Sequence, residues 1–215
     1  LEGLSKPAPV SIRMNERKAI RQFENCKSIP WSRSGFYLEE RPSFTLDPLF
    51  HAGCYYVQEA GSQFLEQLFL HAIKEKEEPI VLDLCAAPGG KSTHLLSLMN
   101  GSGLLVSNEV ISSRNKVLQQ NIAKWGFANS IVTQNDSSDF SKAGELFDVI
   151  VVDAPCSGEG LFRRDPNAAN EWSETAVTAC SVRQHEILDN IHLALKPGGY
   201  LIYSTCTFET AENER

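Results

Sequence analysis

Two cysteines stand directly after apolar runs that are typical of β-strands. Cys156 comes shortly after the run 149–153, and Cys206 follows the run 200–204. Neighbouring parallel strands end at the same edge of a sheet, so both thiols are expected at one cleft. A thiolate there can add to an electron-poor ring and later be eliminated, which is how an unreactive carbon of a pyrimidine can be alkylated.

A small-residue turn opens the segment that should bind a cofactor. Residues 83–91 read DLCAAPGGK, which predicts a strand, a turn that lets a ligand approach the backbone, and the start of a helix. Gly90-Lys91-Ser92 also imitates the end of a phosphate-binding loop. That alternative is weak, because Cys85 stands where the loop needs its first glycine and Pro88 removes a backbone donor.

Acidic residues follow the next two predicted strands. Glu109 lies about 20 residues after the turn, where a carboxylate can accept hydrogen bonds from ribose hydroxyls. Asp136 ends the third strand, where it can accept from an exocyclic amino group. These acids suit S-adenosylmethionine better than a triphosphate, whose charge they would repel. Each acid taken singly could instead be a cap or turn residue, so only their joint placement indicates a cofactor.

The elements that position these residues alternate between strands and helices. Continuous apolar strands between helices predict an α/β, Rossmann-like fold: a mostly parallel sheet with helices on both faces. A helix capped by Ser62 should precede the sheet. Residues 1–50 are expected to form a small N-terminal appendage that positions RNA, and residues 51–215 a catalytic domain. The predicted strands are 80–85, 104–108, 131–134, 149–153 and 200–204, and the predicted helices are 64–73, 92–99, 114–125 and 174–195.

Composition and charge restrict the class of protein. The 215 residues are 42% apolar and 22% charged, as in ordinary globular proteins, and no run is long enough to cross a bilayer. The six cysteines lack metal-site spacing, so no metal, reduced thiols and a cytoplasmic location are expected. The net charge is −7, yet residues 1–41 carry +3, which favours local contacts to RNA phosphates. A solvated helix over 13–21 is the alternative.

Three motifs together resemble one enzyme family. DLCAAPGGK (83–91), DAPCSGEG (153–160) and STCTF (204–208), in this order, are similar to the Sun/Nop family of RNA cytosine carbon-5 methyltransferases, and most closely to the bacterial branch that modifies 16S ribosomal RNA. The resemblance implies an S-adenosylmethionine-dependent enzyme in which Cys206 is the nucleophile and Cys156 assists product release. It also implies that the cofactor is contacted, or its pocket shaped, by Cys85, Ala86, Ala87, Pro88, Gly89, Gly90, Lys91, Glu109, Asp136 and Asp153.

Other interpretations of these motifs remain open. The residues alone do not say which cysteine attacks, and both could be buried structural thiols. Asp153 could hydrogen-bond or help protonate N3 of the base, provided that burial raises its pKa. Amino-group methyltransferases are rivals, although they place Pro-Pro-aromatic where this chain has Pro155-Cys156-Ser157. A rival from another class is an inactive RNA-binding scaffold.

RNA contacts can be assigned only in outline. The target cytosine must lie outside a helix, because neither thiol reaches carbon 6 in a stacked pair. Arg163 and Arg164 follow the fourth-strand motif and could bind phosphates or lie in a solvated loop. Four aromatic residues could stack on bases, with core packing the favoured alternative: Trp31, Phe36, Tyr55 and Tyr56. A monomer is favoured. Two C-terminal strands of the family's sheet are expected to lie beyond this chain.

Overall fold

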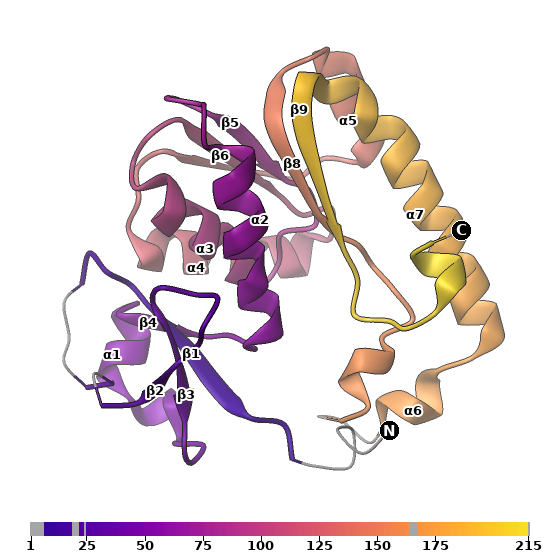
Figure 1. Ribbon diagram of the computed structural model, residues 1–215. Coiled ribbons are helices and arrows are strands. Elements are labelled where there is room, and N and C mark those ends of the chain that lie inside the picture. The colour runs from indigo at the N-terminus through magenta and orange to yellow at the C-terminus, as the bar shows by residue number, and fades with distance from the viewer. Residues whose placement is uncertain (1–6, 19–21, 24, 164–166, 215) are drawn as a thin grey trace.

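The computed structural model describes residues 7–18, 22–23, 25–163 and 167–214 and contains two β-sheets (Figure 1). The first is a four-stranded sheet in the order β2-β3-β1-β4, in which every described pairing is antiparallel. Its strands are β1 (Val10–Met14), β2 (Lys27–Ser28), β3 (Gly35–Leu38) and β4 (Tyr55–Val57), with α1 (Pro48–His51) before β4.

The second sheet has five parallel strands in the order β7-β6-β5-β8-β9. This order reverses direction at β5, so the carboxyl ends of β5 and β8 flank a topological switch point, where ligands bind in such folds. The predicted parallel sheet is therefore confirmed. Its strands are β5 (Ile80–Asp83), β6 (Leu104–Asn108), β7 (Ser130–Thr133), β8 (Phe147–Asp153) and β9 (Leu195–Ser204).

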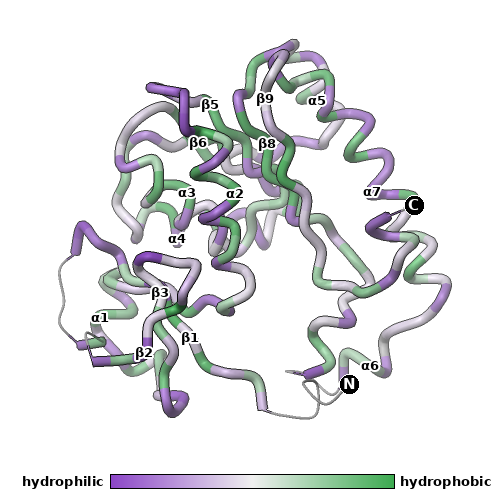
Figure 2. The backbone as a smooth tube through the Cα atoms, in the orientation of Figure 1, coloured by the Kyte–Doolittle hydropathy of each residue, from purple (hydrophilic) through white to green (hydrophobic). Residues whose placement is uncertain are grey.

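Helices cover both faces of the five-stranded sheet, as predicted. One core packs α2, α3 and α4 against the side chains of Val81, Val149 and Val151, and the other packs α5 and α7 against Leu82 and Ile150. The alternation follows from the two-residue period of a strand. Figure 2 shows the apolar colour concentrated along these central strands. The α-helices after β4 are α2 (Leu65–Ala72), α3 (Gly90–Met99), α4 (Ser112–Trp125), α5 (Ser137–Phe140), α6 (Ala168–Glu171) and α7 (Glu174–Ile191), and the 3₁₀ turns are Phe44–Leu46, Gly61–Phe64, Ser141–Ala143, Glu159–Leu161, His192–Ala194 and Thr210–Glu212.

Two local predictions were wrong. Ser62 does not cap a helix: it lies in the 3₁₀ turn Gly61–Phe64, and its backbone N–H donates to the carboxylate of Glu59, 2.8 Å away. The alternative of a solvated helix from Arg13 also fails, because Arg13 lies in β1 and is fully buried. Residues 19–21 of that segment lie outside the described residues.

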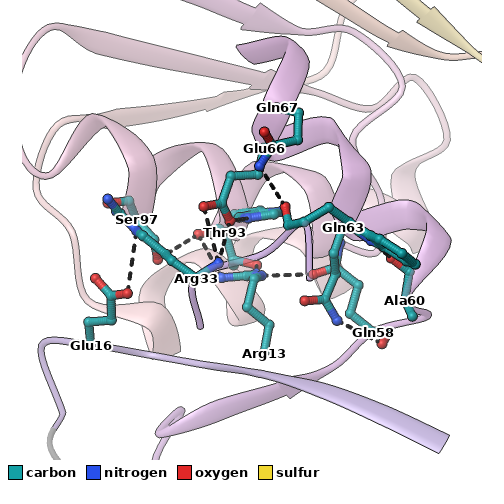
Figure 3. Close-up of polar contacts among 12 residues, drawn as sticks. Arg13, Glu16, Arg33, Gln58, Ala60, Gln63, Glu66, Gln67, Thr93 and Ser97 are labelled. Carbon is teal, nitrogen blue, oxygen red and sulfur yellow. Dashed lines mark hydrogen bonds and ion pairs between the residues drawn. The ribbon is translucent and has the colours of Figure 1, made fainter. Parts of the chain in front are cut away.

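The N-terminal sheet is joined to the second sheet's helices by a buried polar layer (Figure 3). The guanidinium of Arg13 donates to Gln58 Oε1 at 2.8 Å, to Thr93 Oγ1 at 2.7 Å and to the carbonyl of Gly90 at 3.2 Å. Burial lowers the pKa of Arg13 to about 9, so the group stays charged at neutral pH. Arg13 thereby links β1 to the beginning of α3, where the predicted cofactor turn (83–91) ends.

The N-terminal sheet extends past the predicted division at residue 50. β4 lies beyond that position and pairs with β1, so the sheet includes residues as far as Val57. The RNA-positioning role of the N-terminal part stays a prediction. In the part of the chain that the structure describes, no helix combines the length and apolar character needed to span a membrane.

Candidate active site

A cavity of about 1030 Å³ lies at the carboxyl ends of the central strands. Leu84 and Asn108 line it from the ends of β5 and β6, and α7 contributes Ile187 and Asn190. The switch-point position is the one expected for a ligand in this sheet order. Seven of the predicted site residues line this cavity: Cys85, Ala87, Glu109, Asp136, Asp153, Cys156 and Cys206.

The other predicted cofactor residues shape the turn rather than line the cavity. Ala86 donates its N–H to the carbonyl of Asn108 at 2.9 Å, and the carbonyl of Pro88 accepts from Asn121 at 2.7 Å. Gly89 is the N-cap of α3 and has a φ of 110°, and a Cβ there would approach Leu118 to 3.3 Å. The backbone conformation thus favours glycine, and the neighbouring side chain leaves little space for another residue. Gly90, the first residue of α3, has its carbonyl held by Arg13.

The two predicted acids each have a structural partner as well as a place in the cavity wall. Glu109 is 3% exposed, and its carboxylate accepts from the N–H of Ile111 at 2.9 Å and faces Arg114 at 3.5 Å. Asp136 is the N-cap of α5 and accepts from the N–H of Ser138 at 3.0 Å. The cap alternative therefore holds for Asp136. A carboxylate has about four lone-pair sites, so both acids keep acceptor capacity for a ligand.

The charge of the cavity favours a cationic ligand over a polyphosphate. Its wall carries five carboxylates and two guanidinium groups, and this excess of acids repels phosphate charge. The phosphate-loop alternative fails on a second ground. Lys91 is bound to Asp153 at 2.7 Å, and the hydroxyl of Ser92 is buried and donates to Asp83 at 2.6 Å. The buried Ser92 hydroxyl is therefore turned away from the position where a phosphate loop would hold magnesium, and Lys91 is directed to a carboxylate.

A second cavity of about 400 Å³ adjoins the first. Lys91 lines this second cavity, and Asp153, Leu161 and Cys206 line both. Asp153 also accepts from the hydroxyl of Ser204 at 2.9 Å. Its side chain is 42% exposed and ion-paired, so the burial on which its predicted proton-donor role depended is not found. Hydrogen bonding to a ligand remains open to it.

The two cysteines predicted to meet do so. Their sulfur atoms are 3.0 Å apart, and the N–H of Cys206 points at Cys156 Sγ at 3.3 Å. The hydrogen bond between the thiols lowers the pKa of Cys156 to about 7 and raises that of Cys206. One proton held between two sulfurs explains both directions, because the first ionisation is favoured and the second opposed. Cys206 is exposed and Cys156 half-buried, so neither is a buried structural thiol.

Asp83 makes the free energy of unfolding depend on pH. It is fully buried, and burial raises its pKa to about 7, while its Oδ1 has no hydrogen-bond partner in the described part of the chain. A folded pKa above the unfolded value means that the stabilising contribution is complete below about pH 4 and is lost as pH rises through 7. Asp83→Asn should remove this dependence, so the drop in unfolding free energy between pH 5.5 and pH 8 should shrink by about 2 kcal/mol.

Denaturant melts of Asp83→Asn and the unsubstituted protein at the two pH values measure that difference. Comparing each protein with itself cancels the constant cost of placing an amide at this position. An unchanged pH dependence would contradict the assignment to Asp83.

Sequence patterns did not single out several residues of the cavity wall. Arg114 donates to the carbonyl of Ala87 at 2.8 Å, and Asn108 accepts from the N–H of Asn135 at 2.8 Å, so both fix the strand ends. Asn108 ends an apolar run directly before Glu109, a signal that could have identified it. The polar side chains of α7 look like an ordinary solvated helix face in the sequence. Those lining the cavity are Arg183, Glu186, Asp189 and Asn190.

The predicted RNA contacts have mixed placements. Arg163 lines the second cavity and donates to the carbonyl of Pro7 at 2.7 Å, whereas Arg164 lies outside the described residues. The aromatic candidates pack within the fold, as favoured. Tyr55 is 1% exposed, and the indole of Trp31 donates to the carbonyl of Ala60 at 2.7 Å. Phe36 and Tyr56 pack against the two cores. Among the described residues, no three His, Cys, Asp or Glu side chains gather to hold a metal ion.

Comparisons with known proteins cover nearly the whole chain. Residues 70–215 match the family model described as 16S rRNA methyltransferase RsmB/F, and residues 1–60 match the N-terminal domain of 16S rRNA methyltransferase RsmF. Ribosomal RNA small subunit methyltransferase F of Shewanella loihica is 39% identical over 98% of this chain and 46% of its own length. The protein of the same name from Serratia proteamaculans is 43% identical over 100% and 47%.

Solved structures agree in fold. A methyltransferase homolog protein from Pyrococcus horikoshii is 33% identical, with a TM-score of 0.81 over 99% of this chain and 69% of its own. NSun6 from the same organism has a TM-score of 0.82 at 20% identity, over 99% and 79%, which concerns the fold alone. The chain spans about half the length of the curated relatives it matches.

Proposed function

Because the chain belongs to the RsmB/F family of 16S rRNA methyltransferases, we propose that it methylates carbon 5 of a cytosine in 16S ribosomal RNA, with S-adenosylmethionine as methyl donor and Cys206 as covalent nucleophile. The observation that carries this proposal is the pair of thiols 3.0 Å apart beside the junction of two cavities. Attack and elimination both need a thiol, and methyl transfer needs the two substrates to meet.

The first cavity suits the cofactor. Glu109 and Asp136 retain acceptor sites for the ribose and adenine, and the acidic wall suits a sulfonium cation. When bound, S-adenosylmethionine supplies an electrophilic methyl group. The chain's own part is to present an acceptor at each strand end and to bring the backbone of the turn 83–91 close to the ligand.

The second cavity suits the target base. Lys91 and Asp153 there offer a donor and an acceptor, which fits the O2, N3 and exocyclic amino edge of a cytosine withdrawn from its helix. Asp153 and Cys206 also line the first cavity, so a base held by these residues would lie next to the cofactor. We therefore assign Lys91 to the base rather than to the cofactor.

The reaction begins when the sulfur of Cys206 gives an electron pair to carbon 6, which makes carbon 5 nucleophilic. Carbon 5 then takes the methyl group from the sulfonium, whose sulfur keeps the electrons of the broken bond and leaves as S-adenosylhomocysteine. A base then removes the proton on carbon 5, the carbon 5–carbon 6 double bond reforms, and Cys206 leaves as thiolate. Cys156 is placed to accept a proton from Cys206 at the start, and to serve the release step directly or through a water.

The proposal is tested with the full natural protein, 16S rRNA carrying tritium at cytosine carbon 5, and S-adenosylmethionine. We expect tritium to appear in water in step with methyl incorporation, because carbon 5 must lose its hydrogen, and 5-methylcytidine to appear after nucleoside digestion. Methyl transfer without tritium release would point instead to an amino-group methyltransferase. Binding of RNA and cofactor without transfer would indicate a scaffold. Cys26→Ala, which removes a thiol outside both cavities, is the matched control.

A further inference from the structure

The last described segment of the chain lies against both loops that carry the site cysteines. The Cys156 loop (154–158) follows β8, and the Cys206 loop (205–209) follows β9. After the second loop, near the C-terminus of the chain, comes the 3₁₀ turn Thr210–Glu212, which packs beside α7 (Figure 1). Two consecutive residues there, Glu212 and Asn213, direct their side chains into the two loops.

Glu212 holds the Cys156 loop. Its carboxylate is 3% exposed, and Oε2 accepts from the N–H of Ser157 at 3.0 Å and from the amide of Gln184 at 2.8 Å. The same Gln184 amide donates to the carbonyl of Pro155 at 2.8 Å. Both neighbours of Cys156 are therefore fixed through one carboxylate. Among the described residues, no ion pair reaches the Glu212 side chain, and its Oε1 has no hydrogen-bond partner.

Asn213 holds the Cys206 loop in the same way. Its Oδ1 accepts from the hydroxyl of Thr205 at 2.8 Å, and its Nδ2 donates to the carbonyls of Glu209 at 2.9 Å and Thr207 at 3.4 Å. These bonds bracket Cys206 on both sides. The two side chains thus fasten different loops although their backbones are adjacent.

The thiol geometry depends on both loops at once. A sulfur–sulfur distance of 3.0 Å is kept only while each loop holds its position, and the loops are also joined by the hydroxyls of Ser157 and Thr207 at 3.0 Å. We propose that Glu212 and Asn213 are positioning residues with separate duties: Glu212 places Cys156 for product release, and Asn213 places Cys206 for attack. This assignment rests on the proposed function.

Opposite defects are expected from the two alanine substitutions. Glu212→Ala should slow release about 10- to 100-fold, because a displacement of about 1 Å can cost that much, and a covalent RNA–protein species should accumulate. Asn213→Ala should slow adduct formation by a similar factor without accumulation. Glu212→Gln should retain most activity, because one amide oxygen can still accept both bonds. Glu214→Ala, which removes an exposed carboxylate two residues away, should change neither step.

The experiment is a time course with the full natural protein, 16S rRNA and S-adenosylmethionine, read on denaturing gels and by methyl incorporation, with Cys156→Ala run in parallel. The assignment of separate duties is wrong if Cys156→Ala traps RNA and Glu212→Ala does not. It is also wrong if Glu212→Ala and Asn213→Ala share one defect. If Cys156→Ala traps no RNA and the unsubstituted enzyme transfers no methyl group, the proposed function itself fails, and the assignment with it.

If Glu212→Ala or Asn213→Ala does not fold, conservative variants at the same positions test the assignment. Glu212→Asp keeps the charge and withdraws the carboxylate by one methylene from Ser157 and Gln184, so adduct accumulation is expected from it as well. Asn213→Asp keeps the acceptor for Thr205 and loses the donor to Glu209 and Thr207, so slow adduct formation is expected. Normal kinetics in both conservative variants would overturn the proposal.

Discussion

Cys206→Ala is expected to abolish both methyl transfer and the covalent RNA adduct. Without a sulfur to add at carbon 6, carbon 5 of cytosine remains a poor nucleophile, so the rate should fall by at least about 10³-fold. The exposed thiol lies in the wall of both cavities, where its removal leaves the packing of the sheet intact. Single-turnover methyl incorporation into 16S rRNA and a denaturing gel measure the two losses.

Cofactor binding separates a chemical defect from a folding defect. Cys206→Ala should bind S-adenosylmethionine as the unsubstituted protein does, as measured by calorimetry, because the predicted cofactor acceptors are on other strands. Cys26→Ala should retain both activity and adduct. Should Cys206→Ala still form the adduct, Cys206 is not the nucleophile and the reversed assignment, with Cys156 attacking, would stand.

Cys156→Ala is expected to stop the enzyme after methyl transfer. The adduct with Cys206 should form, carry the new methyl group and persist, so about one RNA per enzyme should survive denaturation while turnover falls about 10²- to 10⁴-fold. The reason is geometric: Cys156 provides the thiol 3.0 Å from the leaving sulfur. The mobility of labelled RNA on a denaturing gel measures the adduct. Methyl label from S-adenosylmethionine in the same band shows that transfer has occurred.

Two controls sharpen that experiment. Adding Cys206→Ala to Cys156→Ala should remove the trapped species, since no nucleophile remains. Adduct formation in Cys156→Ala should also need a higher pH than in the unsubstituted enzyme, because the hydrogen-bonded pair loses its first proton at a pKa lowered to about 7 and a lone Cys206 has no partner that lowers its first ionisation. A variant that releases methylated RNA at the normal rate would show that Cys156 does not act in release.

The family assignment leaves a clear division between what is known and what is proposed. Membership rests on a match over residues 70–215, and the parallel sheet with helices on both faces is present in the structure. The proposed cytosine chemistry depends on this geometry, because Asp153 and Cys206 line both cavities and would lie next to both substrates.

Short-range patterns were sufficient for most of the fold. The strand at 104–108 was predicted at its observed bounds, and the helix at 114–125 begins only two residues late. Apolar periods of two and 3.6 residues are local, so the sequence shows them directly. Local signals failed where tertiary contacts decided. The sequence favours a solvated helix or phosphate contacts for the segment that begins at Arg13, yet Arg13 lies in β1, which pairs with β3 and β4, and Gln58, Thr93 and Gly90 bind its buried guanidinium.

The candidate site divides along the same line. That Cys156 and Cys206 follow parallel strands, and that acids follow two others, could be predicted from local patterns, because motif and strand end are adjacent in the chain. Tertiary contacts direct Lys91 to Asp153, place α7 in the wall of the cavity and bring Glu212 to Ser157. These partners are far apart in sequence. Which of them meet depends on sheet register and helix packing, quantities that no local pattern encodes.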